Sequence, residues 1–457
     1  MHDNLAIINN KNPELQIVPC GNITGVVRKI EPPPDWLSGS TINEVVFCEE
    51  YLRENPMCYS GGAFFTVEGC ISDEQLKNSI YEKIKRHVAN GVAKKVTNLM
   101  NVLRLECGQR DLPLQEDRVH VANGTIFVDG TFTTDKEFCQ NRLPVAYHAT
   151  APYPWRWHNF LHELLEPEDV LTLQEYMGYC LIPSNRAQKM LIITGNGGEG
   201  KSRIGVVLQK LFGGNLKNGN LSKVETNAFA RADLEHMLVM VDDDMRMEAL
   251  RSTNYIKSIV TAETPMDLEK KGLQSYQGYL RVRFIAFGNG SLRALNDASY
   301  AFFRRQIQLL AKARNPDRTD DPYLADKLCE ELEGILWWAF QGLQRLVGNG
   351  FEFTLSDATR ARMEEAETES NNILDFMKSD GYFLLDPEGQ TSSKAFYEVY
   401  RLWCSDNAVG ALSAKTFSSV VRQKADQYKL AYTNKIHLND GRLVRGFTGV
   451  KLLHRPE

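Results

Sequence analysis

Residues 191–205 read LIITGNGGEGKSRIG and contain the residue types that bind phosphate. An apolar run enters a glycine-rich loop that ends in Lys201 and Ser202, and a helical pattern follows, in the order G-x-x-x-x-G-K-S. Glycines let backbone N–H groups turn inward around phosphate oxygens, and the next helix adds the positive end of its dipole. We expect Lys201 to reach the β- and γ-phosphates of ATP and Ser202 to bind Mg²⁺. The cofactor-binding residues predicted here are Gly195, Gly197, Gly198, Gly200, Lys201, Ser202 and Arg203. An ordinary glycine-rich turn is the alternative, and the flanking strand and helix patterns make a chance match rarer.

A second apolar strand, HMLVMVDDDM, ends in three consecutive carboxylates, Asp242, Asp243 and Asp244. In ATPases with a phosphate loop, the first acid helps to hold Mg²⁺ and the next polarises the attacking water. We therefore assign Asp242 to the metal and Asp243 to the catalytic base, with Asp244 in reserve if the register moves by one residue. The alternative is a surface acidic turn, in which three adjacent carboxylates repel one another unless a cation or solvent compensates them.

A third strand, LRVRFIAFGNGS, ends in Asn289, and a fourth, FFRRQIQLL, begins after Arg304 and Arg305. An amide at the tip of the third strand can orient the attacking water, although Asn in GNG is otherwise a common turn residue. An arginine from a neighbouring subunit can stabilise the charge of the transition state. We expect Asn289 to be the sensor and Arg305 the arginine finger, supported by Arg304. A salt-bridged strand edge is the alternative for the arginine pair.

Between the second and third strands, Lys270 and Lys271 fall at the tip of an expected hairpin, with Tyr276 and Tyr279 behind them. Lysines neutralise backbone phosphates and aromatic rings stack on bases. The pattern predicts a loop that contacts single-stranded DNA, and a solvated turn is the alternative.

The order of these motifs, namely the phosphate loop, VMVDDD, EKKG, FIAFGNG and FFRRQIQ, resembles that of the superfamily 3 helicases. The preceding PVAYHATAPYPWRWHNF is similar to the segment before the ATPase in phage, plasmid and poxvirus-type primase-helicases. The resemblance implies an AAA+-related fold, a homohexameric ring with ATP between subunits, and one hairpin per subunit that tracks the DNA strand. The sequence departs from the family at Gly288, where Thr or Ser usually precedes the sensor Asn. Residues 1–150 lack the close pair of acids of the family's primase domain, so the chain looks like the helicase part alone.

Residues 370–457 read as helix, helix and a hairpin that turns at Asn439-Asp440-Gly441, which suggests a winged helix. Residues 411–457 contain nine Lys or Arg and three Asp or Glu, whereas the whole chain has a net charge of −5. This concentration of positive charge favours contact with DNA. A basic solvated cap or a protein-binding domain is the alternative. The DNA-binding candidates in this part are Lys415, Arg422, Lys424, Arg442 and Arg445.

The expected fold class is α/β: a P-loop AAA+-like ATPase core with a helical N-terminal region and a small C-terminal winged-helix-like domain. The expected domains are a mixed region of unknown role, a mostly helical collar, the ATPase, a linker and the winged-helix-like domain, at residues 1–70, 71–186, 187–350, 351–369 and 370–457.

Composition is ordinary for a globular protein, with 43% apolar and 24% charged residues. No apolar run is long enough to span a membrane, and the N-terminus lacks the pattern of a secretory signal. Nine scattered cysteines without a C-x-x-C pair signal neither a zinc site nor a disulfide framework. We therefore expect a cytoplasmic protein without membrane contact.

These expectations describe an ATP- and Mg²⁺-dependent replicative DNA helicase of a phage, plasmid or other mobile element. It would translocate on single-stranded or forked DNA as a homo-oligomer, a hexameric ring, with a separate primase or host replication proteins as partners. The alternatives are an origin-binding or assembly ATPase that melts DNA without processive unwinding, a P-loop small-molecule kinase, and an interaction module without hydrolysis.

Overall fold

The computed structural model describes residues 15–20, 23–28, 33–108, 112–245, 250, 252–272, 274–289, 300–370, 372–437 and 442–454. The chain divides into two compact units, Met1–Leu112 and Pro113–Glu457. Each unit has its own hydrophobic core and is described by itself.

The first unit combines short antiparallel strands with three helices around a core that includes Trp36, Phe47 and Leu103. Its elements are β1 (Leu15–Cys20), β2 (Ile23–Arg28), β3 (Leu37–Ser38), β4 (Thr41–Ile42), α1 (Glu44–Glu54), β5 (Cys58–Ser60), β6 (Ala63–Thr66), β7 (Gly69–Ile71), α2 (Asp73–Ile84) and α3 (Val92–Glu106). Ser72 and Gln75 form a capping box that fixes the start of α2. α2 and α3 fall at the start of the part expected to be mostly helical, 71–186, and the boundary expected after residue 70 falls inside this unit.

The second unit begins with a small antiparallel sheet, ordered β10-β9-β8, and two helices. These elements are β8 (Arg118–Val121), β9 (Gly124–Phe127), β10 (Phe132–Thr133), α4 (Trp155–Leu164) and α5 (Pro167–Tyr179). A two-residue turn, Ala122-Asn123, joins β8 and β9, since Val121 pairs with Gly124.

A five-stranded parallel sheet follows, in the order β12-β13-β16-β11-β17, so the α/β class is confirmed. Its elements are β11 (Met190–Thr194), α6 (Ser202–Phe212), β12 (Leu216–Asn218), α7 (Leu221–Thr226), α8 (Ala228–Ala232), β13 (Val239–Met245), α9 (Asn254–Thr261), β16 (Arg283–Gly288), α10 (Tyr300–Phe303), β17 (Gln306–Leu310), α11 (Leu324–Cys329) and α12 (Leu332–Gly348). The hairpin β14 (Met266–Leu268) and β15 (Tyr276–Gly278) lies between α9 and β16.

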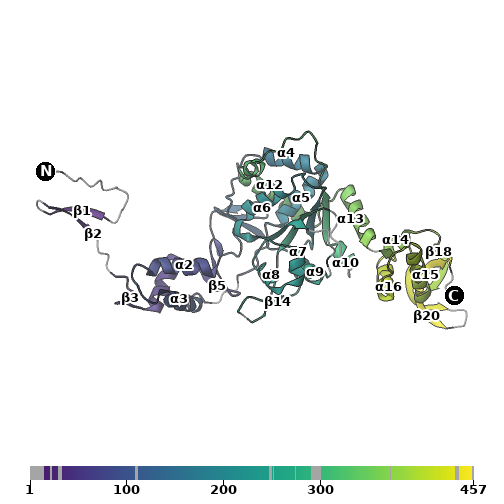
Figure 1. Ribbon diagram of the computed structural model, residues 1–457, viewed down its shortest axis with the longest axis horizontal. Helices are drawn as coiled ribbons and strands as arrows, with labels where there is room; N and C mark the ends of the chain where they lie inside the picture. The colour runs from purple at the N-terminus through teal and green to yellow at the C-terminus, as the bar shows by residue number, and fades with distance from the viewer. Residues whose placement is uncertain are drawn as a thin grey trace. The chain divides into compact units, whose positions relative to one another are not determined.

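Alternate residues of the strands enter two different cores, as the twofold period of a strand requires. Leu191 and Ile193 belong to the core under α5, α6 and α12, whereas Met190 and Ile192 belong to the core under α7 and α9. Figure 1 shows α5, α6 and α12 on one side of the sheet and α7, α8 and α9 on the other. Both faces are covered, which explains the nearly continuous apolar strands.

Buried carboxylates on α5 hold the chain that follows α12. Glu175 is 0% exposed and accepts hydrogen bonds from Arg345 Nε (2.6 Å), Thr354 N (2.7 Å) and Thr354 Oγ1 (2.8 Å). Asp169 accepts from Ser356 Oγ and Thr359 Oγ1, both at 2.8 Å. The stretch expected as a linker, 351–369, is therefore anchored to α5 at its start and is helical in α13 (Asp357–Ser370).

The C-terminal part alternates helices and strands around a core that includes Phe376, Phe396 and Phe447. Its elements are α14 (Asn372–Lys378), β18 (Phe383–Ser392), α15 (Ser393–Asp406), α16 (Ala414–Gln423), β19 (Ala431–His437) and β20 (Leu443–Leu452). The strands form an antiparallel sheet in the order β18-β20-β19. The expected turn at 439–441 lies outside the described residues.

None of the helices in the described part of the chain combines the length and the apolar character needed to cross a bilayer.

Replacing Glu175 tests the anchor. Glu175→Ala leaves three donors without their acceptor, and we expect it to lower the free energy of unfolding by about 2–3 kcal/mol. Glu175→Gln keeps an acceptor and should recover part of the loss. Urea unfolding measures the difference, with Glu168→Ala, an exposed neighbour on α5, as the control. Equal stabilities for the Glu175 and Glu168 variants would refute the anchoring role.

Candidate phosphate-binding site and nucleic-acid contacts

The glycine-rich loop connects β11 to α6 at the carboxyl end of the sheet. Gly197, Gly198 and Gly200 have φ values of 103°, 81° and 111°, which residues with a side chain rarely adopt. Ser202 is the first residue of α6 and is exposed, whereas Lys201 is 8% exposed. Parallel α/β sheets bind ligands at the carboxyl ends of their strands, where the strand order reverses, and this loop follows such a strand.

Glu199, which the motif leaves unspecified, occupies the inside of this loop. Its Oε1 accepts hydrogen bonds from the backbone N–H groups of Asn196 and Gly197, the latter at 2.8 Å. Its Oε2 lies 2.7 Å from Lys201 Nζ, and Glu199 is 2% exposed. Burial favours a higher pKa for Glu199, but the bonds from Lys201 and the backbone outweigh it and lower the pKa below its ordinary value. Glu199 is therefore an anion at neutral pH.

Two arginines that the sequence motifs do not indicate, Arg318 and Arg314, lie against the outside of the loop. Arg318 donates from Nη1 to Glu199 O (2.8 Å) and from Nη2 to Gly198 O (3.1 Å). Arg314 Nη1 lies 3.7 Å from the point that a Cβ on Gly198 would occupy. Both arginines form ion pairs with Asp320, Arg314 at 2.8 Å and Arg318 at 3.3 Å. They follow β17, which ends beside β11, so only the folded sheet brings them to the loop.

Arg203, the last residue predicted to bind the cofactor, is the second residue of α6 and is partly exposed. Its positive charge contributes to the lowered pKa of Asp321, after the larger effects of Lys327 and of the Tyr323 backbone N–H. The structure therefore places Arg203 on the side of α6 that faces the segment after β17.

The three aspartates of β13 differ in exposure. Asp242 is 4% exposed, and its Oδ2 accepts a hydrogen bond from Leu221 N at the start of α7, 2.9 Å away. Asp243 and Asp244 are exposed and lie just beyond Asp242, where the pairing of β13 with β16 becomes irregular. Asp243 faces α6, because its Oδ1 lies 3.8 Å from the point that a Cβ on Gly205 would occupy.

Ser202, Asp242, Asp243 and Asp244 line one open cavity of about 510 Å³ beside α6. This volume lies within the usual range of ligand pockets, about 300–1,000 Å³. Hydroxyl and carboxylate oxygens are ligands that Mg²⁺ prefers, and a few of them usually act together with substrate phosphates. Among the described residues, His, Cys, Asp and Glu side chains form no group of three or more that is arranged as a metal centre. The Ser202 hydroxyl and the exposed carboxylates are donors of the kind that Mg²⁺ takes.

Asn289 lies beside the first residue of the loop, because β16 is the neighbour of β11. With its amide oriented to satisfy both partners, Asn289 Nδ2 donates to Gly195 O (2.6 Å) and Gly288 O (3.3 Å). Gly195 N in turn donates to Gly288 O, at 3.1 Å. The structure therefore brings Asn289 and the glycine-rich loop together.

Arg304 and Arg305 lie at the opposite end of the sheet. They precede β17, whose parallel pairing with β11 runs from Met190–Gln306 to Thr194–Leu310. The five residues of β17, at about 3.3 Å each, separate them from the level of the loop, which is about 16 Å. Neither arginine reaches the phosphate loop of its own chain.

The expected hairpin of β14 and β15 is present, with Lys271 exposed at its turn. Lys270 is different, because it forms an ion pair with Glu235. Tyr276 Oη also donates to Glu235 Oε2, at 2.7 Å. Lys270 is thus held within its own chain, while Lys271 and Tyr279 are exposed.

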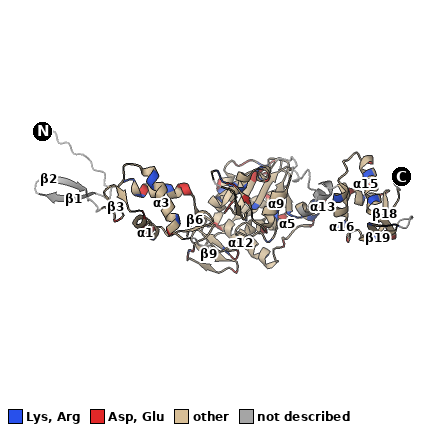
Figure 2. Ribbon diagram, turned by 90° about the horizontal axis from the view of Figure 1, so that it is seen from below, with Lys and Arg blue, Asp and Glu red and all other residues tan. Residues whose placement is uncertain are grey.

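Of the basic candidates of the C-terminal part, Lys415 and Arg422 lie on α16 and Arg445 on β20, whereas Lys424 follows α16 and Arg442 precedes β20. Lys415, Arg422, Arg442 and Arg445 are exposed, and Lys424 is half-buried. The Arg422 guanidinium stacks on Tyr432, 3.3 Å from the ring centre. Figure 2, in which Lys and Arg are blue, shows basic residues on the helices and strands of this part.

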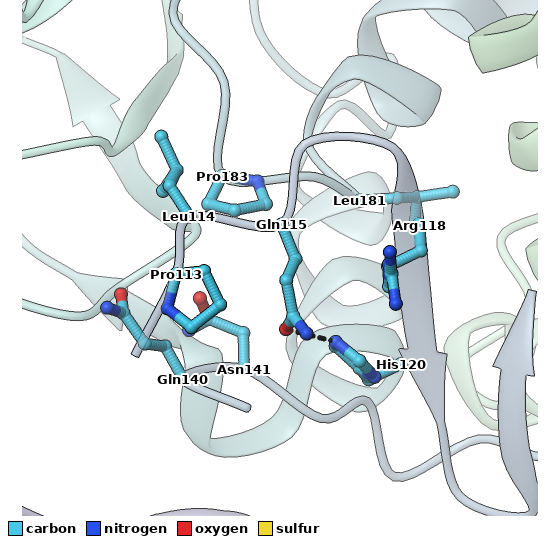
Figure 3. A pocket seen from close by; sticks show the side chains of 9 residues that line it. All are labelled: Pro113, Leu114, Gln115, Arg118, His120, Gln140, Asn141, Leu181 and Pro183. Atoms are coloured by element: carbon cyan, nitrogen blue, oxygen red, sulfur yellow. Dashed lines mark hydrogen bonds between the residues drawn. The ribbon is translucent and has the colours of Figure 1, made fainter. Parts of the chain in front are cut away.

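A second cavity, of about 20 Å³, lies beside His120 and is large enough for one water molecule (Figure 3). His120 Nε2 contacts Gln115 Oε1 (2.7 Å) and Nδ1 contacts Thr125 Oγ1 (3.2 Å). Burial and, secondarily, the charge of Arg142 lower the pKa of His120 to about 4. A neutral imidazole with both nitrogens engaged is a structural group.

The chain matches a family of unknown function (DUF5906) over residues 193–305, from β11 to Arg305. No curated protein matches it. Solved structures of the NrS-1 C-terminal region are similar. The apo structure of residues 305–718 has a TM-score of 0.50 at 11% identity and covers 89% of this chain and 99% of that one. An A-form apo structure of the same region has a TM-score of 0.48 at 11% identity, and the match covers 88% of this chain and 98% of that one. Similarity at this identity concerns the fold alone.

The burial of Asp242 predicts a pH-dependent effect on stability. Burial raises the pKa of Asp242 above its ordinary value of 3.8, although the hydrogen bond from Leu221 opposes this. A carboxyl group with a raised native pKa favours folding below its unfolded pKa, and this advantage is lost as pH rises through the native pKa. Asp242→Asn, which keeps an acceptor for Leu221, should therefore match or exceed the wild-type Tm at pH 7, by up to a few degrees.

The difference in Tm should shrink as the pH falls toward 4, because wild-type Asp242 then becomes protonated. Thermal unfolding at pH 7 and pH 4 measures it, with the exposed Asp244→Asn as the control. A large loss of Tm in Asp242→Asn at pH 7 would contradict the expectation.

Proposed function

We propose that the chain is an ATP- and Mg²⁺-dependent DNA helicase of superfamily 3 that serves the replication of a phage, plasmid or other mobile element. The observation that carries the proposal is the convergence at one end of the sheet of Lys201, Asp243 and Asn289, from three separate strand ends. Hydrolysis of a phosphoanhydride needs these three kinds of group: a cation for the phosphates, a carboxylate for the metal ion that accompanies them and an amide to orient the attacking water.

The loop fits the phosphates of ATP on structural grounds. Its N–H groups at Asn196 and Gly197 already hold a carboxylate, so they are oriented to bind an anion. Ser202 and Asp243 would hold Mg²⁺, which when bound screens the charge of the phosphates. Lys201 would bind the β- and γ-phosphates, and Asn289 would position the attacking water.

The roles of the aspartates follow from their directions. Asp242 is buried and already accepts from Leu221, whereas Asp243 faces α6, the helix that begins with Ser202. We infer that the register moves by one residue from the first assignment. Asp243 then shares the metal with Ser202, and Asp244 polarises the water.

The arginine finger has to act between subunits. Because Arg304 and Arg305 lie at the far end of the sheet from their own loop, they can complete only the site of a neighbouring subunit. This supports the homo-oligomeric ring in the proposal, with Arg305 as the finger.

For the C-terminal part we infer a winged-helix-like domain. Three helices and a three-stranded sheet alternate in the order α14, β18, α15, α16, β19 and β20, and α16 presents Lys415 and Arg422 to solvent. A helix that displays basic residues ahead of a β hairpin suits a DNA groove.

One observation favours a second candidate, an origin-binding ATPase that melts DNA without processive unwinding. The Lys270 ammonium pairs with Glu235 and lies over the Tyr276 ring, although 41% of its side chain is exposed, so one expected strand contact is already engaged. Strand displacement on a forked substrate distinguishes the two.

ATP hydrolysis with and without single-stranded DNA tests the proposal. We expect DNA to stimulate the wild type, and Lys201→Ala to lower the rate by about two to three orders of magnitude, because the phosphates lose their main cation. Lys270→Ala/Lys271→Ala should lose mainly the stimulation by DNA. Lys94→Ala, an exposed lysine on α3, is the matched control. The motor would be ruled out if Lys201→Ala hydrolysed ATP at the wild-type rate. It would also be ruled out if the wild type were a monomer whose ATPase rate did not change with DNA.

The aspartates give a sharper test. Asp243→Asn should lower kcat about a hundredfold or more, since it removes a carboxylate from the cavity beside α6. Asp242→Asn should stay within about threefold of the wild type, because its amide still accepts from Leu221. Steady-state ATPase rates at saturating Mg²⁺ compare them. The reverse order of effects would restore the first assignment, with Asp242 on the metal.

A further inference from the structure

The phosphate-binding loop of this chain already contains an anion of its own. The Glu199 carboxylate is 2% exposed and is held by two backbone N–H groups and by Lys201 Nζ. These are the donors that the proposed function gives to the phosphates of ATP. A carboxylate and a phosphate of like charge cannot share them.

We propose that Glu199 is an internal substitute for phosphate, which holds the loop in the empty protein and must be displaced by the nucleotide. The inference rests on the proposed function, since it concerns the same loop, and goes beyond it by identifying the residue that sets nucleotide affinity.

The site is built around the Glu199–Lys201 pair. A Cβ on Gly195 would lie 2.6 Å from Lys201 Nζ and 2.8 Å from Glu199 Oε1, so the pair fills the space that a side chain at this position would need. Lys201 is 8% exposed, and a buried ammonium without a counter-charge is costly. Glu199 supplies that counter-charge until a phosphate replaces it.

Displacement requires a movement of the side chain alone. Arg318 holds the backbone carbonyls of Gly198 and Glu199 from outside the loop, at 3.1 and 2.8 Å. The backbone that carries Glu199 is thereby fixed, and rotation of the side chain withdraws the carboxylate. The incoming phosphate then takes over all three donors, so the loop keeps its shape while its anion changes.

Competition of this kind lowers the apparent affinity. When the binding-competent form is a fraction of the population, the apparent Kd exceeds the intrinsic Kd by the inverse of that fraction. Charge-assisted hydrogen bonds of the kind Glu199 makes are among the stronger ones in proteins. We therefore expect removal of the carboxylate to tighten nucleotide binding about tenfold.

Calorimetric titration of the full chain with Mg²⁺ and ATPγS tests the inference. Glu199→Gln has nearly the same shape but places an amide N–H₂ against the Lys201 ammonium, which weakens the internal pair. Glu199→Ala removes the pair entirely. Both should lower the Kd for ATPγS, whereas Glu163→Gln, an exposed residue of α4, should leave it unchanged.

Thermal unfolding gives an independent readout in case Glu199→Ala weakens the fold. Without nucleotide, both Glu199 variants should melt below the wild type, because Lys201 loses its partner. Saturating ATPγS should raise their Tm by more than it raises that of the wild type.

The results separate the two claims. If wild type binds ATPγS, Lys201→Ala does not, and the Glu199 variants bind with equal or lower affinity, the inference is overturned and the nucleotide site stands. If neither the wild type nor the Glu199 variants bind ATPγS, the proposed function fails and the inference fails with it. Tighter binding by the Glu199 variants, lost when Lys201→Ala is added, supports both.

Discussion

A buried ammonium group needs a counter-charge, and the arrangement around Lys201 follows from that requirement. Lys201 precedes α6 with 8% of its surface exposed, in a loop whose N–H groups point inward. Two features of such a loop attract an anion: the dipoles of its backbone N–H groups and the charge of the ammonium. Glu199 meets this demand from within, and the three glycines with positive φ provide the curvature that lets a residue two positions away reach back to Lys201.

Buried carboxylates elsewhere in the second unit likewise need partners, in their case hydrogen-bond donors and cations. Glu175 and Asp169 are buried on α5 and are satisfied by Arg345, Thr354, Ser356 and Thr359. Arg345 lies in the last turn of α12 and the other three partners follow that helix, so these bonds tie the end of α12 and the segment after it to α5. A carboxylate that is fully bonded in this way fixes position, whereas Asp243 and Asp244 remain exposed beside α6 and are available to a ligand.

Much of this arrangement could be predicted from the sequence, and the remainder depends on contacts between distant segments. The α/β class followed from strands that alternate with helices, and the positive φ values of the loop followed from its glycines. The engagement of Asp242 did not, because its partner, Leu221 N, lies at the start of α7, 21 residues earlier in the chain. The engagement of Lys270 by Glu235 joins residues 35 positions apart, and Arg318 reaches a loop 119 residues earlier. Glu199 occupies a variable position of the motif, so its type carried no signal until the fold enclosed it.

The ends of the parallel sheet give the chain a direction that bears on its assembly. At the carboxyl end lie the phosphate loop, Asn289 and the exposed aspartates, and at the amino end of β17 lie Arg304 and Arg305. In the proposed motor, an oligomer that brings the amino end of one subunit to the loop of the next supplies each site with both a lysine and an arginine. Because this contact joins two different surfaces, it is heterologous, and such a contact forms a ring when the rotation between neighbouring subunits closes. The internal anion then has a consequence for the ring. A subunit whose loop is filled by Glu199 binds no phosphate, and its neighbour's arginine has no charge to stabilise, so each interface responds to nucleotide only after the carboxylate has left.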